Sequence, residues 1–161
     1  MLEQLLPFLT ASILLTLAPG PDIIYVLVRS IAYGAKQGIV TALGLVSGII
    51  VHTTLVAFGV SAVIKQSENL FLIIKIFGAV YLLYLAWQVY KSDPEIAFSA
   101  EGVSNKKLGS LYRQGFIMNV LNPKVGIFFL AFFPGFLWST EMDTVWQFYI
   151  LGFVFMFQAL I

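Results

Sequence analysis

The stretch LAPGPD at residues 17–22 interrupts the first apolar run of this chain, and LNPK at residues 121–124 interrupts the fourth. Each stretch brings proline and one charged side chain, Asp22 or Lys124, into a run of membrane length. Because proline lacks a backbone N–H and clashes with the carbonyl four residues before it, each stretch is expected to break its helix. A charge at that depth is costly unless it lines a protein-walled or watery cavity. The two breaks therefore point to a transporter.

The composition of the 161 residues indicates a membrane protein. Hydrophobic residues make up 60% of the chain and charged residues only 11%, whereas soluble domains carry about 25% charged residues. The net charge of +1 gives no electrostatic support for nucleic acid as a partner. The absence of cysteine excludes disulfides and thiolate chemistry. The expected surroundings are a lipid bilayer.

Apolar runs of membrane length predict an all-α, polytopic membrane protein. A helix needs about 20 apolar residues to cross the hydrocarbon, and five such runs are visible, at about residues 5–28, 38–64, 70–90, 112–138 and 144–161. We expect one transport domain with a first three-helix half at 1–90, a cytoplasmic loop at 91–111 and an incomplete second half at 112–161. The fifth run is still apolar where the sequence stops, so a truncated second half lacking its sixth helix is expected.

The distribution of Lys and Arg predicts the orientation. Basic residues gather in the first and third connections between runs, at Arg29, Lys36, Lys91, Lys106, Lys107 and Arg113. Positive charge favours the cytoplasmic side, which places the N-terminus in the periplasm. A half with three spans ends on the opposite side of the membrane from where it begins. A second three-span half is therefore inverted relative to the first, and each half has a broken first helix. Matching breaks in two halves indicate a transporter binding site.

The first break offers backbone and side-chain groups to a polar ligand. Pro19, Gly20 and Pro21 free backbone carbonyls and open the N-terminus of the following helix. Asp22 falls in the first turn of that helix, where the positive helix end favours a carboxylate. A purely structural cap and a role in binding substrate or protons are both open for Asp22, and the two roles can coexist.

The second break repeats this arrangement with the opposite charge. Asn122 and Pro123 precede Lys124, which lies about ten residues into its run, near the limit for snorkelling to the interface. Pairing with Asp22 or with a substrate carboxylate is the favoured alternative. If the halves pack face to face, Asp22 and Lys124 match the ammonium and carboxylate of an amino acid.

His52 and four glycines complete the candidate residues. His52, the single histidine, is a candidate for proton coupling, although a structural hydrogen bond to a neighbouring helix is slightly favoured. With no other histidine, no cysteine and no carboxylate cluster, no metal site is expected. Gly34, Gly38, Gly44 and Gly48 form small-residue spacings that let helices approach closely, within one chain rather than at a dimer interface.

Other function classes fit the sequence less well. A passive channel would need a second copy of the asparagine–proline motif, and a structural membrane subunit would not need Asp22 and Lys124 within its spans. No zinc-protease or serine-hydrolase motif is present, so neither an enzyme nor a cofactor is predicted. The oligomeric state, including a homo-oligomer, is left open.

At these residues the chain resembles the LysE/RhtB family of bacterial amino-acid exporters. The resemblance rests on four motifs in family order, LAPGPD at 17–22, GAKQGIVTALGLVSGIIVH at 34–52, KIFGAVYLLYLAW at 75–87 and GFIMNVLNPKVGIFFLAFFP at 115–134. It implies a multi-pass inner-membrane protein of about six helices that exports amino acids or related metabolites, energised by the proton motive force. Under this resemblance, the proline–glycine–proline and asparagine–proline–lysine motifs are the ones expected to bind the substrate.

Overall fold

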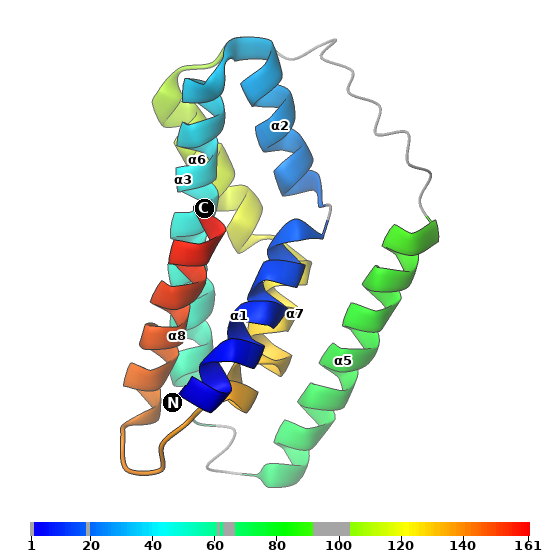
Figure 1. Cartoon of the computed structure of the whole chain (residues 1–161), viewed down its shortest axis with the longest axis vertical. Coiled ribbons are helices and arrows are strands. Elements are labelled where there is room, and N and C mark those ends of the chain that lie inside the picture. The colour runs from blue at the N-terminus through cyan, green and yellow to red at the C-terminus, as the bar shows by residue number, and fades with distance from the viewer. Residues whose placement is uncertain (1, 19, 61, 63–66, 92–103) are drawn as a thin grey trace.

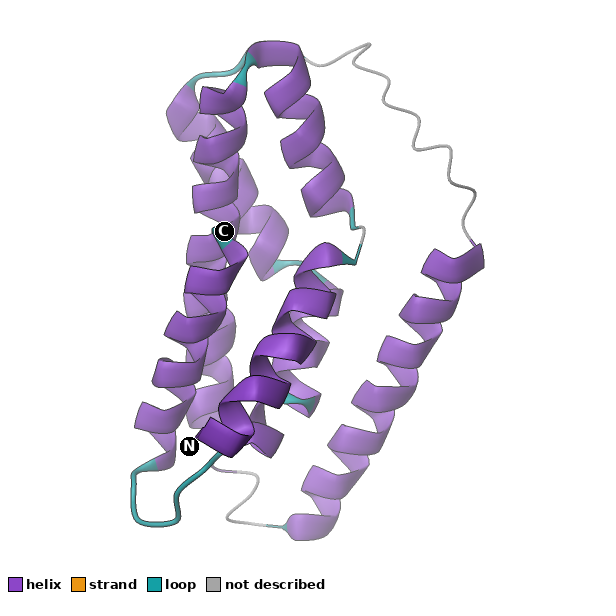
Figure 2. Ribbon diagram, in the orientation of Figure 1, coloured by secondary structure: helices purple, strands orange, loops and turns teal. Residues whose placement is uncertain are grey.

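The computed structural model describes residues 2–18, 20–60, 62, 67–91 and 104–161, and every regular element within these ranges is helical (Figure 2). The elements are α1 Leu2–Leu17, α2 Pro21–Tyr33, α3 Ala35–Leu55, the π-helical turn η1 Val56–Val60, α5 Glu68–Lys91, α6 Leu108–Val120, α7 Pro123–Ala131, the short 3₁₀ helix η2 Phe133–Phe136 and α8 Thr144–Ala159. This confirms the all-α class.

Both expected breaks separate helices. α1 ends at Leu17 and α2 begins at Pro21, with a bend of 60° between them. α6 ends at Val120 and α7 begins at Pro123. In Figure 1, α1 and α2 run upward, α6 and α7 run downward, and both breaks lie near the middle of the long axis. The two broken helices are therefore antiparallel, and their breaks lie at the same height.

The described helices give fewer spans by length than the five expected. Ala35–Val60 and Asn69–Gln88 are long and apolar enough to cross a membrane, and the bent pair α1–α2 makes a third if it is counted as one span. The run expected at 112–138 is divided between α6, α7 and η2, and α8 has only 16 residues. The count of five spans and the inverted repeat are therefore not confirmed.

The long helix α3 packs closely on α6 through two glycines. A Cβ added to Gly44 would collide with the backbone carbonyl of Tyr112, and one added to Gly115 would collide with that of Thr41. The absence of side chains at both positions brings the two backbones into contact, as in small-residue interfaces of membrane helices. This contact fixes the height of α6, and hence of the second break, along α3.

Phenylalanines contribute a large share of the buried core among the described residues, at Phe8, Phe128, Phe129, Phe133, Phe148 and Phe155. Phe129 of α7 stacks on Phe133 at a centroid distance of 4.1 Å and meets Phe155 of α8 edge to face at 5.3 Å. Phe8 of α1 contacts Phe133 edge to face at 5.3 Å. α1, α7 and α8 therefore form one apolar unit. By contrast, α5 contacts mainly α7, and only 6% of its span is buried.

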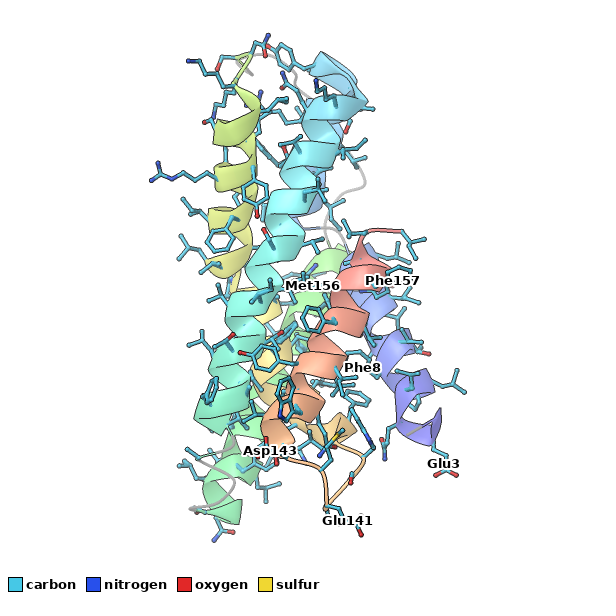
Figure 3. The ribbon with its side chains drawn as sticks, turned by 90° about the vertical axis from the view of Figure 1, so that its left-hand side faces the viewer. Glu3, Phe8, Glu141, Asp143, Met156 and Phe157 are labelled. Atoms are coloured by element: carbon cyan, nitrogen blue, oxygen red, sulfur yellow. The ribbon has the colours of Figure 1, made fainter. Side chains whose placement is uncertain are left out.

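Acidic and basic residues gather at opposite ends of the molecule. Figure 3 places Glu3, Glu141 and Asp143 at one end. The opposite end holds the start of α3, which includes Lys36. It also holds the residues directly before α6, which include Lys106 and Lys107. Of the expected cytoplasmic loop at 91–111, residues 92–103 lie outside the described part of the chain.

Candidate binding site at the two helix breaks

The two breaks meet through side-chain hydrogen bonds. Asn122 Nδ2 donates to Asp22 Oδ2 at 3.2 Å, and Lys124 Nζ donates to the carbonyl oxygen of Ala18 at 2.8 Å. These bonds join residues that are 100 and 106 positions apart in the sequence. Residues from both breaks therefore form one polar cluster, which we call the break cluster: Ala18, Gly20, Asp22, Asn122 and Lys124.

Local chemistry places each member of the break cluster. Asn122 is the N-cap of α7, with its Oδ1 accepting from the backbone N–H of Lys124 at 3.0 Å, and Pro123 occupies the first turn. This is a favourable start for a helix, since proline needs no hydrogen-bond partner there. Asp22 follows Pro21 in the first turn of α2, where the helix dipole favours a carboxylate.

Gly20 makes room for the charged groups. Its φ of −141° is available to any residue, so conformational freedom does not explain the glycine. A Cβ at this position would lie 2.5 Å from Asp22 Oδ1 and 3.4 Å from Lys124 Nζ. The glycine therefore allows the carboxylate and the ammonium to share one small space. Pro19, also predicted as a site residue, lies outside the described residues.

The polar groups of the break cluster are only partly satisfied. Asp22 Oδ1 is buried and has no hydrogen-bond partner in the described part of the chain. Lys124 interacts coulombically with Asp22 while its ammonium bonds the carbonyl of Ala18, at the C-terminal end of α1. A cation is favourable at this negative helix end. The cluster thus holds both charges and leaves one carboxylate oxygen available.

Two cavities border the break cluster. The first, about 200 Å³ and here called the inner cavity, is lined by Asp22, Asn119 and Lys124 among mostly apolar side chains of α1, α2, α3 and α8. The second, about 610 Å³, lies between α1, α5 and α7 and reaches Gly20, Asn122 and Lys124. Lys124 borders both. Pockets for small ligands share this design, with apolar walls and a few convergent polar groups.

His52 holds the second break in place. Its buried Nε2 donates to the backbone carbonyl of Asn119 in the last turn of α6 at 3.0 Å, and its ring lies 5.8 Å from that of Phe129. Because a carbonyl oxygen can only accept, Nε2 carries the proton in this bond. His52 therefore ties α3 to the C-terminal end of α6.

The four predicted glycines fall into two groups. Gly38, Gly44 and Gly48 face neighbouring helices, where an added Cβ would meet Ser30, Tyr112 and Asn119, respectively. Gly34 has no neighbour within 4 Å of an added Cβ and adopts a φ of 85° between α2 and α3. It ends α2, because a side chain disfavours this backbone conformation.

Sequence reasoning missed several buried polar residues, among them Asn119 and Arg29. Asn119 is 5% exposed and lines the inner cavity, three residues before Asn122 in an otherwise apolar stretch. That isolated amide was the signal that could have identified it. Arg29, read from the sequence only as an orientation charge, is 2% exposed and donates to Tyr25 and to the carbonyl of Ser104. Among the described residues, no three metal-ligating side chains gather.

Comparisons with known proteins place the chain in a family. The family model for LysE type translocators matches residues 13–161. The leucine efflux protein of Salmonella typhimurium is 31% identical over 145 residues, covering 90% of this chain and 68% of that protein. An uncharacterized membrane protein of Vibrio cholerae is 30% identical over 147 residues, covering 91% and 71%, respectively. No solved structure matches. The match over nearly the whole sequence confirms the resemblance carried by the four motifs: the chain belongs to the LysE type translocator family.

Proposed function

We propose that this chain exports amino acids or closely related metabolites across the bacterial inner membrane by proton-coupled secondary transport. One observation carries the proposal: Asp22 and Lys124, from two broken helices about 100 residues apart in sequence, meet in one cluster between two cavities. Charges of both signs within an apolar helical bundle suit a zwitterion. The name of the leucine efflux relatives supports the same substrate class.

In this proposal each charge of the substrate replaces an existing partner. The substrate ammonium binds the free Oδ1 of Asp22, and its carboxylate takes the ammonium of Lys124 from the carbonyl of Ala18. The N–H groups at the starts of α2 and α7 add positive potential for the carboxylate. Gly20, Pro21, Asn122 and Pro123 shape the backbone around this site, and Pro19, outside the described residues, stays a proposed site residue from its place in the sequence.

The proposed topology places the two antiparallel broken helices in two inverted three-helix halves, with the N-terminus in the periplasm. The antiparallel course of α1–α2 and α6–α7 supports the inversion. The acidic end that holds Glu3, Glu141 and Asp143 supports a periplasmic N-terminus, since basic residues favour the cytoplasmic side. The two halves would then alternate access to the break cluster.

Asp22 is the proposed proton-coupling residue, and His52 is the second candidate. Asp22 lines the inner cavity and its Oδ1 has no hydrogen-bond partner among the described residues, whereas Nε2 of His52 is engaged by the carbonyl of Asn119. Protonation of Asp22 would release a bound ammonium, which couples the proton to substrate release. Asp22→Asn removes this charge but keeps an oxygen that can accept from Asn122, and His52→Gln keeps an N–H donor.

Counterflow of labelled leucine in proteoliposomes, at matched and opposed pH gradients, tests the proposal. We expect saturable exchange in the wild type, loss of its dependence on the pH gradient in Asp22→Asn, and an unchanged dependence in His52→Gln. Flux that does not saturate would replace the exporter with a passive channel. Absence of flux for leucine and a mixture of amino acids would favour a structural subunit. Gradient dependence that survives Asp22→Asn and disappears in His52→Gln would transfer coupling to His52.

A further inference from the structure

Two residues that each carry a buried, unpartnered oxygen line the same cavity. Within the described ranges, four buried side-chain atoms lack a hydrogen-bond partner, and they belong to Asp22, Gln37, Thr53 and Asn119. Only Asp22 and Asn119 of these four line the inner cavity. A buried polar atom without a partner costs about 1–3 kcal/mol, and hydrocarbon surroundings offer it no water. The coincidence of two such atoms at one cavity indicates a ligand that donates hydrogen bonds.

Asn119 is held rigidly at the second break. Its backbone carbonyl accepts from His52 Nε2 at 3.0 Å and from the N–H of Asn122 at 2.9 Å. Its side chain packs on Gly48 of α3, where an added Cβ would lie 2.7 Å from Asn119 Oδ1 and 2.8 Å from its Cβ. Gly48 therefore provides the space that this side chain occupies. The side chain of Asn119 therefore has a fixed position against α3, and the residue lines the inner cavity.

The two free oxygens have the same chemical requirement. Both Asp22 Oδ1 and Asn119 Oδ1 accept hydrogen bonds, and an ammonium group supplies three donors. A hydroxyl group supplies only one donor and carries no charge to pair with the carboxylate. The pair of acceptors therefore favours an amine over an alcohol at this place. Lys124, which also lines the cavity, provides the opposite charge.

The remaining wall of the inner cavity is mostly aliphatic, and Thr16 and Phe155 also line it. Its contributors include Leu15, Ile23, Val26, Leu45, Val46 and Ile49. A volume of about 200 Å³ lies below the range of about 300–1,000 Å³ that is common for ligand pockets. A compact aliphatic side chain suits this wall, because a further polar group would be buried against apolar surface over most of it.

We propose that Asn119 is a specificity-determining residue: its Oδ1, together with Asp22 Oδ1, binds the ammonium group of an α-amino acid whose aliphatic side chain fills the inner cavity. This inference rests on the proposed export function and adds a residue and a substrate class to it. Asn119 selects the amino group, and the apolar wall selects the side chain. A 2-hydroxy acid of the same shape lacks the groups that both oxygens require.

Leucine and its 2-hydroxy analogue, 2-hydroxy-4-methylpentanoate, separate these roles. The measured quantity is the ratio of their inhibition constants against labelled leucine counterflow in proteoliposomes. Asn119→Leu removes the oxygen while keeping the number and branching of the side-chain heavy atoms, and Asn119→Ala removes it while enlarging the cavity. Thr53→Val is the matched control, since Thr53 also carries a buried unpartnered oxygen but does not line the inner cavity.

We expect both Asn119 variants to raise the KM for leucine about tenfold and to reduce the preference for leucine over the hydroxy acid by a similar factor, as loss of a hydrogen bond to a charged group predicts. Thr53→Val should change neither. The preference is a ratio measured on active protein, so it does not depend on how much of a variant folds. An unchanged preference in both variants would overturn the role of Asn119 while leaving export intact. Absence of saturable flux in the wild type would instead refute the export function itself.

Discussion

The first break has no side chain capping its second helix, whereas the second break caps itself. α2 begins after Gly20, which has no side chain and so makes no cap hydrogen bond to the first N–H groups. α7 begins after Asn122, whose Oδ1 accepts from the N–H of Lys124. Asn122 and Lys124 also reach across to Asp22 and Ala18 of the first break. The second break therefore organises the first, and changes in the second are expected to affect both.

Removal of the cation should have the largest effect. Lys124→Met leaves the carbonyl of Ala18 without its donor and Asp22 without its counter-charge. Loss of one partner in a desolvated charge interaction costs about 2 kcal/mol or more, equivalent to about a 30-fold fall in kcat/KM. Counterflow kinetics in proteoliposomes provide the measurement.

Lys75→Met is the control for this change. Lys75 lies on the exposed face of α5, with its ammonium 5.3 Å from the ring centroid of Phe71 and no place in either cavity that borders the break cluster. We expect the control to transport normally. Equal kinetics in Lys124→Met and the wild type would mean that Lys124 neither binds substrate nor organises the first break.

An added methyl group at Gly20 should have a smaller effect on the same cluster. Gly20→Ala keeps an allowed backbone conformation, but its Cβ would force Asp22 Oδ1 out of its position at 2.5 Å. We expect about a tenfold rise in KM, the size of one lost hydrogen bond to a charged group. Gly109→Ala in α6, where an added Cβ meets nothing within 4 Å, serves as the control. A normal KM in Gly20→Ala would show that the carboxylate position is not critical.

The sequence predicted the positions of the two helix breaks better than it predicted the contacts between the residues at them. Proline chemistry is local, so the ends of α1 and α6 follow from residues 17–22 and 121–124 alone. From the sequence, Asp22 and Lys124 were expected to approach each other only if the two halves pack face to face. It did not predict that Lys124 bonds the backbone of Ala18, because that partner depends on the height of α7 beside α1.

The same reason explains why Asn119 was missed. Its environment depends on how α6 crosses α3, which is fixed by Gly44 and Gly115 and by the space at Gly48. The glycine spacing in α3 predicted a close contact, but no sequence rule identified α6 as its partner. Roles that depend on helix register across more than 60 residues became visible only in three dimensions. Roles that depend on one turn of helix, such as the N-cap of α7, follow from local residue types.

Substitution of Asn122 should have the smallest effect, and it separates the two roles of this side chain. Asn122→Ala removes the N-cap of α7 and the donor to Asp22, so it should lower the free energy of unfolding by about 1 kcal/mol and weaken substrate binding. Asn122→Ser keeps a capping oxygen but not the amide donor, so it should recover stability without recovering the KM. Asp143→Ala, which removes the N-cap of α8 far from the site, should lower stability similarly and leave transport unchanged. Thermal unfolding and counterflow on the three variants measure the two effects separately. If Asn122→Ser restored both quantities, the bond from Asn122 to Asp22 would have no part in transport, and the second break would support the first through Lys124 alone.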